Sequence, residues 1–143
     1  MANRFKFDLQ KVLEIREDKE KESVRLFKDS QEAVINAESE LRNLNEKYDE
    51  YKIIRKNESA AFQKIKRNYI NSLAGVIKQK EKELLVKKND LERRRRDLLE
   101  KQKEKKTVEI IKNKRYDQFI KEENRKEQVV LDELALYSYF KKE

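Results

Sequence analysis

The chain has 143 residues, of which 46% are charged and 36% belong to the usual apolar set, with one glycine and no proline, cysteine, histidine or tryptophan. So few turn-forming residues and so little apolar material exclude a compact core of several layers and favour long helices that bury a narrow seam. The usual catalytic bases, nucleophiles, soft metal ligands and glycine-rich phosphate loops are missing. We therefore predict a protein that is not an enzyme and that uses no cofactor and no metal.

No stretch approaches the roughly 18 consecutive apolar residues that a membrane-spanning helix needs. The N-terminus also lacks the unbroken apolar stretch of a secretory signal. We therefore expect a soluble protein that is at most peripheral to a membrane. High charge with few apolar residues is also typical of disorder, but six tyrosines, six phenylalanines and a regular apolar period favour a folded chain.

The first predicted element is a helix over residues 8 to about 56. It follows the stretch "FKFDLQKVLEIRED", in which Asp8 can cap a helix that starts at Leu9. Phe5 and Phe7 precede this cap, so they either fold back against the helix or insert into a partner. Further along, apolar residues recur at alternating spacings of three and four, which is the pattern of a coiled-coil seam. This seam consists of Val34, Ala37, Leu41, Leu44, Tyr48 and Tyr51, and Leu13, Ser23, Phe27 and Ser30 precede it in phase.

The second predicted element is a helix over about 64 to 140, reached through a reversal at about 57 to 63. Asn57 and Ser59 are good caps or turn formers, and the lone Gly75 offers an alternative site for the reversal. Only the earlier reversal places apolar residues of one helix opposite apolar or small residues of the other. The opposed pairs are Leu44 with Ile77, Tyr48 with Leu73, Ala37 with Leu84, Ser30 with Leu91, Ser23 with Leu98, and Leu13 with Val108. We predict an all-α fold in which a single domain, residues 1 to 143, forms an antiparallel two-helix coiled-coil hairpin shaped as an elongated rod.

The second helix is predicted to overshoot the first. Its last part, "VVLDELALYSYF" at 129 to 140, has apolar groups around much of the helix circumference. A helix that is apolar over more than one stripe requires more than one neighbour. We therefore expect this segment to dock on another chain.

The net charge of +8 is concentrated in one stretch. Residues 78 to 106 hold thirteen Lys or Arg and seven Asp or Glu. Four consecutive residues of a helix point about 100° apart, so the basic cluster Arg93, Arg94, Arg95 and Arg96 encircles the axis instead of lining one groove. This arrangement favours acidic loops of a protein partner over nucleic acid.

Several motifs together resemble the family of the flagellar type III export protein FliJ. The first is the N-terminal Phe-x-Phe-x-Leu-x-x-Val-Leu-x-x-Arg-Glu pattern from Phe5 to Glu17. It is followed by "LRNLNEKYDEY" at 41 to 51, "YINSLAGVIKQ" at 69 to 79 and "DELA" at 132 to 135, so the resemblance extends over essentially the whole chain. The resemblance implies a flagellar assembly protein of the bacterial cytoplasm, located peripherally at the cytoplasmic face of the inner membrane.

The resemblance also implies partners. It implies that the joined N- and C-terminal end enters the ring of the hexameric flagellar export ATPase, like the central stalk of rotary ATPases. The residues that we assign to this contact are Phe5, Phe7, Leu9, Val12, Arg16, Leu131, Leu134 and Tyr137. It further implies binding to the cytoplasmic domain of the export-gate membrane protein. The gate-facing residues are Leu44, Tyr48, Tyr51, Tyr69, Leu73, Val76 and Lys80, and Lys80 stands where the family usually has an uncharged side chain.

Export chaperones are a third implied partner. We expect a monomer that binds neither nucleic acid nor a small-molecule substrate. Three alternatives stay open: the related stalk protein of a virulence-type secretion system, a purely structural coiled-coil spacer or adaptor, and a basic helix that binds nucleic acid.

Overall fold

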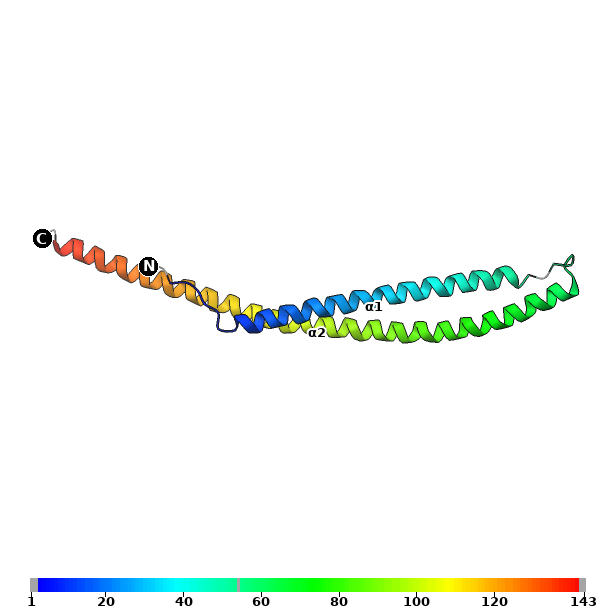
Figure 1. Cartoon of the computed structure of the whole chain (residues 1–143). Coiled ribbons are helices and arrows are strands. Elements are labelled where there is room, and N and C mark those ends of the chain that lie inside the picture. The colour runs from blue at the N-terminus through cyan, green and yellow to red at the C-terminus, as the bar shows by residue number, and fades with distance from the viewer. Residues whose placement is uncertain (1–2, 54, 142–143) are drawn as a thin grey trace. The chain divides into compact units, whose positions relative to one another are not determined.

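The computed structural model describes residues 3–53 and 55–141 and contains two α-helices, α1 (Gln10–Tyr51) and α2 (Ala60–Lys141), with no strand among these residues (Figure 1). The two helices pack against each other, and the predicted all-α hairpin is confirmed. Contacts between residues divide the chain into two units, and both helices contribute to each of them. The terminal unit consists of Met1–Glu20 and Glu100–Glu143, and the turn unit is Lys21–Leu99.

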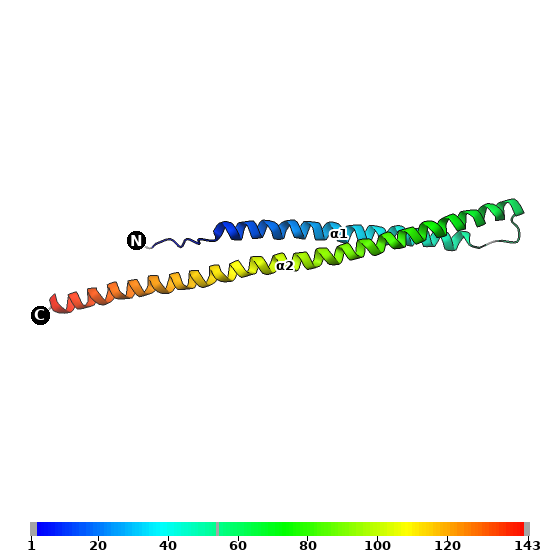
Figure 2. The same cartoon turned by 90° about the horizontal axis from the view of Figure 1, so that it is seen from below.

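The turn unit is an antiparallel pair of helix segments, which Figures 1 and 2 show side by side and joined at one end. Its buried residues all belong to the predicted seam. They are Ser23, Ser30, Val34 and Ala37 from α1 and Leu73 from α2. The hydroxyl of Ser30 lies 3.0 Å from a carboxylate oxygen of Asp90, the neighbour of Leu91, as the predicted register requires.

The reversal lies between Tyr51 and Ala60, so it overlaps the predicted 57 to 63 but begins and ends a few residues earlier. Ser59 determines where α2 begins, because its hydroxyl accepts a hydrogen bond from the backbone N–H of Phe62 at 3.2 Å. Its carbonyl accepts the first helical bond, from the N–H of Gln63 at 2.9 Å. A serine whose side chain satisfies the third N–H of a helix is a standard N-cap. The predicted bounds of 8 to 56 and 64 to 140 therefore differ from the observed ones.

Gly75, the alternative site for a reversal, lies inside α2 and is exposed. No atom lies within 4 Å of the position that a β-carbon would occupy there. The glycine is thus not required by a turn or by a close approach, and the helix tolerates its cost of about 1 kcal/mol relative to alanine.

The terminal unit has its own small core. Leu13 and Val108 are buried together, as predicted, and Phe7 joins them from the segment that precedes α1. The prediction that Asp8 caps this helix is wrong, because α1 begins at Gln10, whose N–H donates to the carbonyl of Phe7 at 3.1 Å. The carboxylate of Asp8 instead lies 3.6 Å from the guanidinium of Arg115.

None of the helices in the described parts of the chain has a segment both long and apolar enough to cross a bilayer.

A buried hydroxyl links the two helices of the turn unit. Ser30 donates to Asp90, which also accepts a hydrogen bond from Arg93 at 2.6 Å. The bond from Ser30, more than the nearby guanidinium of Arg93, lowers the pKa of Asp90 below its ordinary value. A carboxyl group with a lowered pKa stabilises the fold above its ordinary pKa, and this contribution is lost as the pH falls through the folded value.

We predict that Ser30→Ala is less stable at neutral pH than its matched control Ser23→Ala. Both substitutions remove a buried hydroxyl and gain the same helix propensity. Of these two serines, only Ser30 donates a hydrogen bond to a carboxylate of the other helix. The difference should be about 0.5–1 kcal/mol, since the partly exposed Asp90 can turn to water. Urea unfolding followed by circular dichroism measures it. The difference should shrink at acidic pH, and a difference that does not change with pH would exclude the carboxylate as its source.

Candidate functional site

The residues predicted to face the export gate all lie in the turn unit, but they differ in exposure. Tyr51, Tyr69 and Val76 are exposed, with 38%, 42% and 45% of their surface accessible. Leu73 is buried in the seam, where its side chain supports the pair of helices, and its assignment to the gate-facing surface stays a prediction. Leu44 and Tyr48 are half-buried, so each packs partly in the seam and exposes the rest of its side chain.

The exposed tyrosines belong to a hollow in the turn unit. The rings of Tyr51 and Tyr69 meet edge to face across the two helices, with centroids 5.1 Å apart. Phe62, Ile65 and Lys66 line the same hollow, which we call the turn hollow. Sequence analysis missed Phe62 and Ile65 because they lie outside the heptad seam. Two large apolar residues off the seam in the first turns of a helix are the signal that could have identified them.

Cations of the turn hollow and the gate-facing set have intramolecular partners. The ammonium of Lys66 pairs with the carboxylate of Glu58 and lies 5.2 Å from the ring centroid of Phe62. Lys80 lies 3.4 Å from a carboxylate oxygen of Glu83 and 3.4 Å from one of Glu40 on α1. Both carboxylates raise the pKa of Lys80 above its ordinary value, and Glu83 has the larger effect. Lys80 therefore links the helices and is not a free charge for a partner.

The predicted ATPase-binding residues lie in the terminal unit, and those from the N-terminal segment contact α2. Phe7 is only 9% exposed and packs with Leu13 and Val108. Phe5 contacts Tyr116 and Phe119, with ring centroids 5.3 and 5.6 Å apart. The phenylalanines thus fold back within the unit, and their contact with the ATPase ring stays a prediction.

Two of the remaining N-terminal residues predicted to bind the ATPase also have contacts within the chain. Leu9 packs against the same core. Arg16 donates a hydrogen bond to the backbone carbonyl of Glu104 at 2.7 Å. Val12 is exposed and stays available for a partner.

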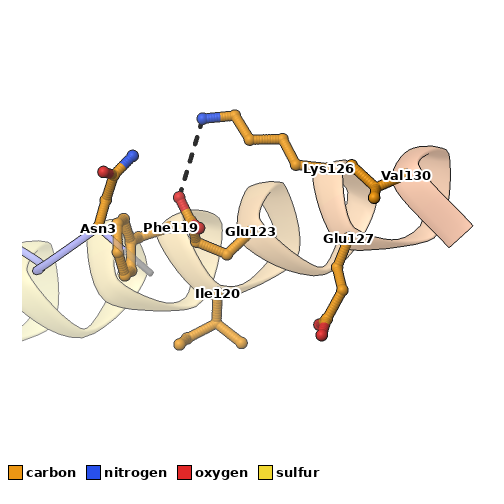
Figure 3. A pocket seen from close by; sticks show the side chains of 7 residues that line it. All are labelled: Asn3, Phe119, Ile120, Glu123, Lys126, Glu127 and Val130. Carbon is orange, nitrogen blue, oxygen red and sulfur yellow. Dashed lines mark ion pairs between the residues drawn. The ribbon is translucent and has the colours of Figure 1, made fainter. Parts of the chain in front are cut away.

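The C-terminal part of α2 is the least covered part of the terminal unit. Every described residue from 124 onward is exposed, and Leu131, Leu134 and Tyr137 have 55%, 57% and 66% of their surface accessible. Figure 3 shows Asn3 beside Phe119, where the N-terminal segment lies against α2. It also shows the open surface that leads from Ile120 towards Val130.

The basic cluster does not form one cationic face. Arg93 pairs with Asp90 at 2.6 Å, and Arg95 lies 3.9 Å from a carboxylate oxygen of Glu92. The guanidinium of Arg95 also lies 5.9 Å from the ring centroid of Phe27. Arg94 is half-buried and Arg96 is exposed. The expected absence of nucleic-acid binding remains a prediction.

These features define a class of protein: a two-helix coiled coil that pairs through a thin seam and leaves large apolar side chains exposed in both units. Within this class the chain belongs to the flagellar FliJ protein family, because the family model described as "Flagellar FliJ protein" matches residues 5–143. The protein is thus a component of flagellar protein export, and the predicted family is confirmed. No curated protein and no solved structure matches the chain.

We predict that Phe7→Ala lowers the stability of the terminal unit by about 2 kcal/mol, because it removes a buried ring from a small core. Hydrogen exchange at the amide of Leu13, together with urea unfolding, measures the loss. Tyr137→Ala is the matched control, since this ring is exposed and its loss should change stability by less than about 0.5 kcal/mol. Equal effects of the two substitutions would mean that Phe7 adds nothing to the core.

Proposed function

We propose that this protein is the stalk of the flagellar export machinery, binding the hexameric export ATPase and linking it to the cytoplasmic domain of the export-gate membrane protein. It acts in the bacterial cytoplasm as a monomer, peripherally at the cytoplasmic face of the inner membrane. It also escorts export chaperones, and it has no catalytic activity of its own. The observation that carries this proposal is the uncovered apolar end of α2 in a chain that belongs to the FliJ family.

The distribution of apolar side chains on this end supports a partner that surrounds the helix. Leu131, Leu134 and Tyr137 are three residues apart, so they share about a third of the helix circumference. Leu136 and Tyr139 are equally exposed and point to other sides. One flat partner would cover only one of these faces. The lumen of a ring contacts a helix from several sides, and this geometry matches the observed distribution.

The N-terminal segment contributes to the same contact in a different way. Since Phe5 and Phe7 pack on α2, they hold the segment against the helix before any partner binds. A preformed surface avoids the entropy cost of ordering a flexible segment during association. We therefore propose that these phenylalanines position the ATPase-binding surface, while Val12 and the exposed leucines contact the ring.

The exposed aromatic groups of the turn unit support the gate contact. Tyrosine is enriched at binding interfaces because its ring packs while its hydroxyl bonds a partner. Tyr51 and Tyr69 are already in contact, so they offer a rigid pair, and Val76 adds an apolar side chain one to two turns further along α2. A purely structural spacer would have no use for aromatic groups exposed in this way.

We predict that Leu131→Glu combined with Leu134→Glu weakens binding to the export ATPase about thirtyfold or more, and abolishes any stimulation of ATP hydrolysis. The exposed leucines are replaced by charges that a close-packed lumen would have to desolvate. Titration calorimetry with the purified hexamer measures the affinity. The control, Leu85→Glu combined with Val86→Glu, places the same charges at equally exposed positions of the turn unit and should bind normally. Unchanged affinity in the first variant would contradict the stalk contact.

We predict that Tyr51→Ala combined with Tyr69→Ala weakens binding to the gate's cytoplasmic domain about tenfold or more, and changes helicity little, because both rings are half-exposed. Surface plasmon resonance and circular dichroism measure the two effects. Leu73→Ala provides the comparison, since this buried residue should lower stability by about 2 kcal/mol or more. If the tyrosine variant lost as much stability as Leu73→Ala, the tyrosines would be part of the core only.

A further inference from the structure

The segment around the reversal of the chain carries a strong excess of positive charge. Residues 51 to 69, which we call the turn end, contain six Lys or Arg and one acidic residue. Lys52 pairs with Asp49 at 3.2 Å, just before this segment, and Lys66 pairs with Glu58. The other four cations have no ion-pair partner among the described residues. They are Arg55, Lys56, Lys64 and Arg67.

The turn end also exposes apolar groups among these cations. Ile53 is 60% exposed in the turn, and Phe62 and Ile65 are 46% and 63% exposed in the first turns of α2. In a helix pair stabilised by a thin seam, such residues would normally be expected on the inner side. Here Phe62 and Ile65 line the turn hollow, and Ile53 lines a neighbouring hollow together with Phe62. Figures 1 and 2 show that the turn closes one end of the turn unit, so no described segment continues past it to cover these side chains.

Cations interspersed with exposed apolar and aromatic groups match the chemistry of an anionic bilayer surface. Lys and Arg near such a surface are attracted by phosphate headgroups, while Phe and Ile enter the boundary between headgroups and acyl chains. We propose that the turn end of this protein is a membrane-contact site that binds anionic phospholipid. The proposal rests on the peripheral location proposed above. It assigns lipid contact to the cations and to Ile53, Phe62 and Ile65, and it leaves Tyr51 and Tyr69 to the gate.

The arrangement of the cations favours lipid over an acidic protein loop. The unpaired cations are distributed over the turn and the first two turns of α2, instead of converging on one point. They are flexible side chains without partners that would fix their geometry, as attraction to fluid headgroups permits. The one cation that lines the hollow, Lys66, is already neutralised by Glu58, so the hollow itself offers no free charge for a specific carboxylate.

The first test uses the absence of tryptophan from the chain. Phe62→Trp places a single fluorophore in the turn end, and Leu85→Trp places one at an exposed position of α2 outside it. Vesicles of phosphatidylcholine alone are compared with vesicles of equal parts phosphatidylcholine and phosphatidylglycerol. We expect a blue shift for Phe62→Trp only, and only with the anionic vesicles.

The second test separates charge from apolar contact. Lys64→Gln combined with Arg67→Gln should weaken co-sedimentation with the anionic vesicles about thirtyfold. Ile53→Ser combined with Ile65→Ser should weaken it about tenfold or more. The matched controls are Lys82→Gln combined with Lys87→Gln, and Leu85→Ser combined with Val86→Ser, and they should bind as the parent protein does. Circular dichroism verifies that each variant keeps its helicity.

Two outcomes would overturn the proposal. One is no binding of the parent protein to anionic vesicles at low salt, which would leave the turn end to an acidic protein partner. The other is equal weakening by the Lys82/Lys87 control, which would reduce the effect to the net positive charge of the chain. Neither outcome touches the stalk function, because affinity for the ATPase is measured separately with Leu131 and Leu134.

Discussion

The thinness of the seam between α1 and α2 is the constraint on which the rest of the structure depends. Three of the five buried residues in the described part of the turn unit are small, Ser23, Ser30 and Ala37, and they let two charged helices approach without a wide apolar face. No large side chain of the described residues is fully buried. Stability must therefore be the sum of many small contributions, and no single contact dominates it. A fold of this kind has little apolar burial to spare, so every large apolar group outside the seam requires an explanation other than the core.

Charge pairs across the helices supplement this seam. Two ion pairs join the helices of the turn unit, with N–O distances of 3.4 Å for Lys80 and Glu40 and 3.6 Å for Lys88 and Glu38. A third, between Lys105 and Glu20 at 2.6 Å, joins the helices of the terminal unit. Exposed ion pairs of this sort contribute only about 0–1 kcal/mol each. They therefore add to the seam without dominating the stability of the helix pair. The seam thus makes pairing favourable, and the ion pairs supplement it in both units.

The heptad period predicted the buried positions well, because burial in a helix pair follows directly from spacing. Leu13, Ala37, Leu73 and Val108 were all expected in the seam and are buried. The predicted reversal overlaps the observed one but is placed a few residues late at both ends, because α1 ends at Tyr51 and the cap at Ser59 starts α2 at Ala60. The position of Phe7 could not be predicted either, since a phenylalanine before a helix can bury its ring equally well against its own chain or against a partner. The contact between Tyr51 and Tyr69 in the turn hollow depends on where the chain reverses, whereas Phe62 and Ile65 could have been identified as large apolar residues outside the seam.

The exposed apolar residues divide the molecule by role. Residues with seam spacing are buried and hold the fold, whereas Phe62, Ile65, Leu131 and Leu134 add nothing to the seam and remain accessible. Keeping such groups exposed carries a risk of aggregation, which the high density of surrounding charge counteracts. The same charge explains why the two exposed regions need not compete for one partner. The C-terminal end of α2 is apolar on several sides with mixed charge, while the turn end is strongly cationic. Different electrostatic surroundings select different partners for similar apolar groups, so these two regions can serve contacts of distinct chemistry.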